Sequence, residues 1–238
     1  MPNSIQEFPA TRWSLISQVR TGSEAEAGAA LDKLCHTYWR PLYAFARWWG
    51  APPETAPDLV QGFLSSFIER GDLIRSSPEK GRFRAFLLAA FKNHLISARR
   101  REQAEKRGGG LIFVALEDAC GEEKWRAAIE QEIGPEEAYD RRWAEEVMIQ
   151  AMAQVENDYR RAGNETVFAV LKPALTGGGD DFASLGSRIG LSAGGARSAM
   201  HRMRQKLREA LRGEIAQTVA TPQDLEDEMR YLLGLLAR

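Results

Sequence analysis

Apolar residues recur every three or four positions along most of this chain, and this periodicity limits the fold more than any other feature. One side of a helix is marked between residues 24 and 50 by Leu31, Leu34, Tyr38, Leu42, Phe45 and Trp49. The same spacing predicts further helices at 57–70, 81–102, 135–162, 166–175 and 182–216, the last as two helices around a turn. No β-hairpin signal and no alternation of strands with helices is present, so the expected fold class is all-α.

One short segment, LIFVALED at 111–118, is predicted to be a strand or a buried extended stretch. It follows the glycine triplet 108–110, which breaks helical structure, and precedes acidic sequence. We therefore expect two helical domains joined by an acidic linker. The expected parts are an N-terminal extension (1–24), a first helical domain (25–107), the linker (108–140), a helix-turn-helix domain (141–215) and a C-terminal amphipathic helix (216–238).

The charge of the chain is balanced overall but unevenly placed. Its 32 basic and 33 acidic residues give a net charge of −1, so the whole protein is neither polybasic nor polyacidic. Residues 82–107 carry eight basic and two acidic residues (net +6), and residues 197–212 carry six and one (net +5). Between them, residues 117–146 carry eleven acidic and four basic residues (net −7). Two basic blocks separated by an acidic one predict two surfaces for a polyanion.

Several classes of site have no support in the sequence. The two cysteines, Cys35 and Cys120, belong to no Cys/His cluster, so neither a zinc site nor a disulfide framework is predicted, and no cofactor is expected. No basic-then-apolar leader is present, and no apolar run approaches the roughly 20 residues of a membrane span. We expect a cytoplasmic protein without a membrane partner. The acidic pairs at 136–137 and 180–181 are interpreted as surface charge, so no enzymatic activity is expected.

The segment GRFRAFLLAAFKNHLISARRR, at 81–101, joins an apolar helix side to a basic one. Arg84, Lys92 and Arg99 fall within an arc of about 80° and have no acidic residue four positions away. We therefore expect an unpaired strip of cations beside aromatic residues, which suits a nucleic-acid backbone with exposed bases. The strip, with its preceding loop, comprises Lys80, Arg82, Arg84, Lys92, Asn93, Arg99 and Arg100. The alternative is an ordinary solvated helix face.

A helix-turn-helix is predicted in ASLGSRIGLSAGGARSAMHRMRQKLR. Leu185 and Ile189 anchor its first helix, Gly190 permits a left-handed turn, and Ser192 is a natural N-cap for the second helix. In the second helix Ala196, Met200, Met203 and Leu207 are expected to face inward. The outward candidates for contact with DNA are Ser192, Arg197, Ser198, His201, Arg202 and Lys206. The alternative is a helical hairpin with a basic exposed side.

The C-terminal segment TPQDLEDEMRYLLGLLAR predicts an amphipathic helix that Thr221 caps. Its expected apolar stripe is Leu225, Met229, Leu232, Leu233 and Leu236. Two interpretations are open: the helix completes the core of the second domain, or its acidic side lies near 197–212 and competes with DNA.

Taken together, these segments resemble the extracytoplasmic-function (ECF) type of bacterial RNA polymerase sigma factor, in a subgroup with N- and C-terminal additions. PDLVQGFLSSFIER, at 57–70, is similar to the core-binding helix of that family, with Asp58, Gln61, Phe63 and Phe67 at matching places. The resemblance covers about 25–107 and 141–213.

The basic segments resemble the two promoter-reading motifs of the same family. The −10 motif is matched by Phe83, Arg84, Phe86, Asn93, Arg99 and Arg100, although Phe86 replaces a tryptophan and Ser97 an acidic residue. The −35 motif is matched by Arg197, Ser198, His201 and Arg202, whereas Gly195 and Ala196 stand where a threonine and a valine are usual.

The resemblance implies a sigma factor that directs core polymerase to promoters and assists melting. The expected partners are the β′ clamp helices and β flap of core polymerase, promoter DNA, and an anti-sigma factor as a further candidate. Contact with polymerase is expected at the polar side of the 57–70 helix, through Asp58, Gln61, Ser65 and Glu69. Two rival functions stay open. A stand-alone helix-turn-helix regulator has no need of the 57–70 helix, and an interaction protein that sequesters its partners binds no DNA.

Overall fold

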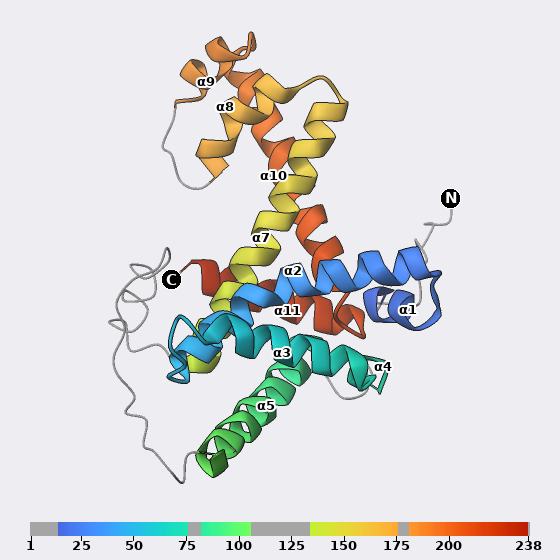
Figure 1. Ribbon diagram of the computed structural model, residues 1–238. Helices are drawn as coiled ribbons and strands as arrows, with labels where there is room; N and C mark the ends of the chain where they lie inside the picture. Colours follow the sequence, from blue (N-terminus) through green and yellow to red (C-terminus); the bar gives the residue numbers. More distant parts are fainter. Residues whose placement is uncertain (1–13, 76–81, 106–133, 176–180, 238) are drawn as a thin grey trace. The chain divides into compact units, whose positions relative to one another are not determined.

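The described residues form helices joined by turns, and no strand is present among them (Figure 1). The computed structural model describes residues 14–75, 82–105, 134–175 and 181–237. The expectation of an all-α fold is confirmed for these residues, while the extended segment predicted at 111–118 lies outside them. The chain divides into two compact units: unit 1 comprises the residues up to Glu146 and from Ala216 on, and unit 2 is Val147–Ile215.

Unit 1 gathers helices from both ends of the chain. They are α1 (Ser14–Thr21), α2 (Glu24–Trp48), α3 (Ala56–Glu69), α4 (Asp72–Arg75), α5 (Phe83–Glu105), the first turns of α7 (Pro135–Arg161), and α11 (Pro222–Leu236). A capping box starts α2, where the Ser23 hydroxyl accepts from the Glu26 N–H and the Glu26 carboxylate accepts from the Ser23 N–H. Gly50, with a φ of 97°, ends the same helix in a left-handed turn.

Aromatic side chains from α2, α3 and α5 form the core of unit 1. The ring centroid of Phe91 lies 4.9 Å from that of Phe63 and 6.1 Å from that of Phe45, and Tyr38 meets Phe83 edge-on at 5.4 Å. Edge-to-face and tilted contacts of this kind add to the stability that burial provides.

The spacing of Leu59, Phe63 and Phe67 predicts an inward apolar stripe on the helix at 57–70, and the structure differs from this prediction by one residue. The buried side chains are Ala56, Val60, Phe63 and Phe67, whereas Leu59 is only partly buried. The prediction of Leu59 as an inward residue is therefore wrong. Steps of four, three and four residues stay on one side of a helix with 3.6 residues per turn, whereas two consecutive steps of four drift away from it.

The C-terminal helix α11 belongs to unit 1, so the interpretation that it completes the core of the helix-turn-helix domain is wrong. Thr221 caps it as predicted, through a capping box with Asp224. Its buried side consists of Leu225, Glu228, Met229, Leu232 and Leu235. Leu233 was predicted to be buried but is 50% exposed. The reason is that the side of α11 that packs against the rest of unit 1 includes Glu228 and leaves Leu233 out.

Unit 2 contains the rest of α7 with α8 (Glu165–Leu175), α9 (Phe182–Arg188) and α10 (Ala193–Ala216). Its core joins apolar side chains of all four helices: Val155, Phe168, Leu171, Leu185, Met200 and Met203. Burial of Ala196, Met200 and Met203 on one side of α10 leaves the opposite side of that helix to solvent. None of the helices in the described segments has the length and apolar character needed to cross a membrane.

Candidate nucleic-acid interfaces

The guanidinium of Arg84 lies inside unit 1 rather than on an exposed strip. The residue is 7% exposed. Its Nε donates to Glu228 Oε1 at 2.8 Å and its Nη2 donates to Glu228 Oε2 at 3.1 Å, while Nη1 donates to Asp140. The guanidinium carbon also lies 5.0 Å from the ring centroid of Trp143 and 4.8 Å from that of Tyr231. Arg84 is thus held by two carboxylates and two aromatic rings.

The protonation states in this cluster follow from its burial and its charges. Burial alone lowers the pKa of Arg84, but the hydrogen bonds and charges of Glu228 and Asp140 outweigh it, so the net shift is upward. Burial, together with the hydrogen bond that the Tyr231 hydroxyl donates to Asp140 at 2.7 Å, raises the pKa of Tyr231 to about 12. At neutral pH the cluster therefore holds a charged guanidinium and a neutral phenol.

Lys92 is paired as well. Its Nζ lies 2.5 Å from Glu136 Oε1, and this hydrogen bond lowers the pKa of Glu136. The expectation of an unpaired cation strip is therefore wrong for Arg84 and Lys92. The physical reason is that both acidic partners come from distant segments, 144 and 44 residues away, and so lie outside the turn of helix that residues four positions apart share.

The other predicted residues of this segment are placed differently. Asn93, Arg99 and Arg100 have exposed side chains on α5. Arg82 is partly exposed, and its Nε lies 3.4 Å from Glu228 Oε1. Lys80 lies outside the described residues. The structure thus separates a buried, paired Arg84 from an exposed C-terminal part of the helix.

Four members of the Arg84 cluster were missed by sequence reasoning: Asp140, Trp143, Tyr231 and Glu228. For Glu228 a signal was available. It stands three residues after Leu225 and four before Leu232, so it interrupts the apolar side of α11 with a charge. A carboxylate at such a position requires a buried partner, because an unpaired buried charge is strongly unfavourable.

The polar side of α3 is open to solvent, as predicted. Asp58, Gln61, Ser65 and Glu69 are all exposed, since the buried residues of the helix lie on its other side. Their accessibility is established for this conformation, while contact with polymerase stays a prediction.

The turn between α9 and α10 has the predicted chemistry. Gly190 has a φ of 71°, and the Leu191 N–H donates to the Gly186 carbonyl at 2.8 Å. The Ser192 hydroxyl accepts from the Gly195 N–H at 3.1 Å and so caps α10. A further requirement was not foreseen: a Cβ on Gly186 would lie 2.5 Å from the Leu191 carbonyl oxygen. The turn is therefore tight enough to need glycine at both positions.

Beyond this turn, α10 has a buried and an exposed side. Ala196, Met200 and Met203 are buried, whereas Leu207 is only partly so. Every predicted DNA-contacting residue of the helix-turn-helix is exposed: Ser192, Arg197, Ser198, His201, Arg202 and Lys206. The guanidinium carbon of Arg197 lies 5.3 Å from the ring centroid of Phe182, the first residue of α9, so a cation–π contact joins the two helices.

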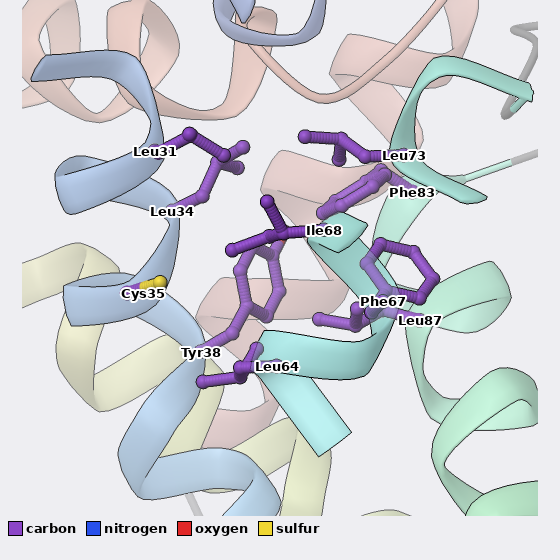
Figure 2. A pocket seen from close by; sticks show the side chains of 10 residues that line it. All are labelled: Leu31, Leu34, Cys35, Tyr38, Leu64, Phe67, Ile68, Leu73, Phe83 and Leu87. Atoms are coloured by element: carbon purple, nitrogen blue, oxygen red, sulfur yellow. The ribbon is translucent and has the colours of Figure 1, made fainter. Parts of the chain in front are cut away.

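Unit 1 also contains an apolar depression (Figure 2). It is lined by Leu31, Leu34, Cys35, Tyr38, Leu64, Phe67, Ile68, Leu73, Phe83 and Leu87. No charged side chain is among them, so the depression offers nothing to fix a polyanion. Burial, with a smaller contribution from Asp32, raises the pKa of the Cys35 thiol and keeps it protonated.

Comparisons with protein-family models, with curated proteins and with solved structures find no match to this chain.

Proposed function

We propose that this protein is an RNA polymerase sigma factor that resembles the ECF type and directs core polymerase to specific promoters. The observation that carries the proposal is the exposed side of α10. A short helix, a glycine turn and a capped second helix place Arg197, His201 and Arg202 on one accessible side. A helix presented in this way fits the major groove, where arginine pairs with guanine.

The polar side of α3 supports the polymerase part of the proposal. It joins acidic and amide side chains on one exposed helix side whose sequence is similar to the core-binding helix of the family. A regulator that binds DNA by itself does not need such a surface. In the proposed mechanism α3 binds core polymerase, α10 reads the −35 element, and the exposed end of α5 meets the −10 element.

Run-off transcription tests the proposal. Purified core polymerase, the full chain and fragmented genomic templates are expected to give discrete transcripts that neither protein gives alone. Arg202→Ala is expected to reduce these transcripts, while Lys172→Ala, an exposed lysine on α8, serves as a charge-matched control in unit 2. Absence of chain-dependent transcripts on all templates, with the chain folded, would refute the proposal.

A stand-alone helix-turn-helix regulator is the second candidate, and the pairing of Arg84 and Lys92 favours it. Both cations are engaged within the chain, so α10 is the more accessible basic surface for DNA. Under this alternative, the chain binds duplex DNA with the same affinity in the presence and absence of core polymerase.

A further inference from the structure

Three cations predicted to meet DNA at the start and middle of α5 face carboxylates from distant segments of the chain. Glu228 on α11 makes the paired hydrogen bonds to Arg84 and also lies 3.4 Å from the Arg82 Nε. Glu136, in the first turn of α7, lies 2.5 Å from the Lys92 Nζ. Asp140, one turn later on α7, adds a second carboxylate to Arg84. Acidic residues thus cover the basic side of this part of α5.

A glutamate carboxylate and a phosphate are similar acceptors for a guanidinium. Each offers two oxygens that share negative charge and accept two parallel hydrogen bonds. We propose that α11 and the first turns of α7 act as an intramolecular mimic of nucleic-acid phosphates, so that single-stranded DNA binds this part of α5 only by displacing them. The inference rests on the proposed function in one respect: the displacing strand is that of a promoter.

The pairs differ in how easily a competitor reaches them. The side chains of Lys92 and Glu136 are 31% and 55% exposed, so solvent and salt weaken their attraction. The Arg82 side chain is 36% exposed, which leaves its guanidinium within reach of solvent while Glu228 neutralises it. A strand therefore meets Lys92 and Arg82 first. It reaches Arg84 only after Glu228 has withdrawn.

The resting position of α11 is set by apolar contacts as well as by charge. Leu225, Met229 and Leu232 are buried on the same side as Glu228. The state in which α11 covers Arg84 is therefore dominant. Because DNA binds only the small fraction of molecules in which α11 has moved away, the apparent affinity of α5 for DNA is low. Removal of the Glu228 charge raises that fraction and also leaves the charge of Arg84 less neutralised.

Two variants that each remove one negative charge test the inference in the full chain: Glu228→Gln and Glu136→Gln. The first keeps an oxygen that accepts from Arg84, which favours folding. Each has a control with the same charge change on the same helix, Asp227→Asn, whose partner Arg230 is three residues away, and Glu145→Gln, paired with Arg142. The probe is a labelled single-stranded oligonucleotide of mixed sequence. Glu228→Gln is expected to bind it roughly fivefold or more tightly, Glu136→Gln less so, and the controls as the unaltered chain does.

A double variant identifies the cation that is released. The gain of Glu228→Gln is expected to disappear when Arg84→Gln is added. Hydrogen exchange on the unaltered chain supplies a measurement without substitution: α11 is expected to lose amide protection when the oligonucleotide is bound at saturating concentration. Equal affinity of Glu228→Gln and Asp227→Asn, a gain that survives Arg84→Gln, or an α11 that stays protected in the bound chain would each overturn the inference.

The outcome is separable from that of the proposed function. If transcription depends on the chain but Glu228→Gln and Glu136→Gln bind the oligonucleotide no more tightly, the proposed sigma-factor function stands and the phosphate mimic does not. An Arg84-dependent gain in affinity, without transcription on any template, means that the phosphate mimic stands and the proposed sigma-factor function does not.

Discussion

Glu228, in the last helix of the chain, receives two hydrogen bonds from the guanidinium of Arg84, which lies 144 residues earlier. Glu228 is 1% exposed and Arg84 7% exposed, so the pair is buried. In such a pair each charge depends on the other, because neither has water as an alternative partner. The pair therefore makes the C-terminal helix an integral part of unit 1, and it gives a structural role to the arginine that the sequence predicts for DNA.

The first prediction concerns this pair. Arg84→Met removes both hydrogen bonds from the buried Glu228 carboxylate and leaves it only the longer contact with Arg82, so unit 1 is expected to lose about 3–5 kcal/mol of stability. Adding Glu228→Leu removes this poorly compensated charge and is expected to restore most of the loss. Urea unfolding followed by tryptophan fluorescence measures both, since Trp143 adjoins the guanidinium. Arg230→Met, on the exposed side of α11, is the control, and an equal loss there would contradict the assignment.

The second prediction separates adjacent leucines of α11. Leu232 is fully buried, whereas Leu233 is 50% exposed. Leu232→Ala is expected to cost about 2–5 kcal/mol, because it leaves a cavity in the core of unit 1. Leu233→Ala is expected to change the unfolding free energy by about 0.5 kcal/mol or less. Equal costs, measured by thermal unfolding, would mean that α11 is turned differently from its position here.

The third prediction concerns two glycines of the helix-turn-helix. Gly186→Ala places a Cβ 2.5 Å from the Leu191 carbonyl oxygen, so the turn has to open. We expect a loss of stability and of duplex DNA binding together. Gly194→Ala meets no atom closer than 3.9 Å and is expected to stabilise α10 by up to about 1 kcal/mol. Circular dichroism melts and gel-shift titrations measure the two effects, and a Gly186→Ala variant as stable as the unaltered chain would refute the tight turn.

The fourth prediction is a loss of stability at alkaline pH. Burial raises the pKa of Tyr38 and of Tyr139, and burial with the Asp140 hydrogen bond raises that of Tyr231 to about 12. An unfolded tyrosine has a pKa of about 10. Because the folded pKa values are the higher ones, the contribution to stability is complete below pH 10 and is lost as the pH rises through the folded values.

Unfolding followed by circular dichroism, beside phenolate absorbance, tests this directly. Between about pH 10 and 12 the unfolding free energy is expected to fall, and Tyr231→Phe is expected to make the fall shallower. Ionisation of Tyr38 and Tyr139 near pH 10 while the helices stay folded would contradict the burial of these two side chains.

The fifth prediction addresses polymerase. Asp58→Lys reverses a charge on the exposed side of α3 and is expected to weaken capture by immobilised core polymerase without affecting the thermal melt. Asp32→Lys, exposed on α2, makes the same change elsewhere in unit 1 and is the control. If the two variants are captured equally, α3 is not the polymerase contact.

The local elements were predictable because their causes are local. The period of apolar residues marked α2, α3, α7 and α8 to within a few residues, and the caps at Ser192 and Thr221 follow from side chains that reach their own backbone. The exposed side of α10 was also predictable, since burial of Ala196, Met200 and Met203 leaves the remaining side to solvent. Leu59 and Leu233 were placed wrongly, because a stripe of leucines does not reveal which edge of it meets the core.

The sequence by itself thus determined the all-helical class, the turn of the helix-turn-helix and the accessible residues of α3 and α10. Only the tertiary structure decided that α11 joins unit 1, and that Arg84 and Lys92 have acidic partners. The reason lies in the range of the forces. Helix period, capping and turn strain act over a few residues, whereas a buried ion pair forms wherever folding brings opposite charges together. Local spacing indicates that Glu228 needs a buried partner, but it does not reveal that the partner lies 144 residues away, and it does not pair Lys92 with Glu136 across 44 residues.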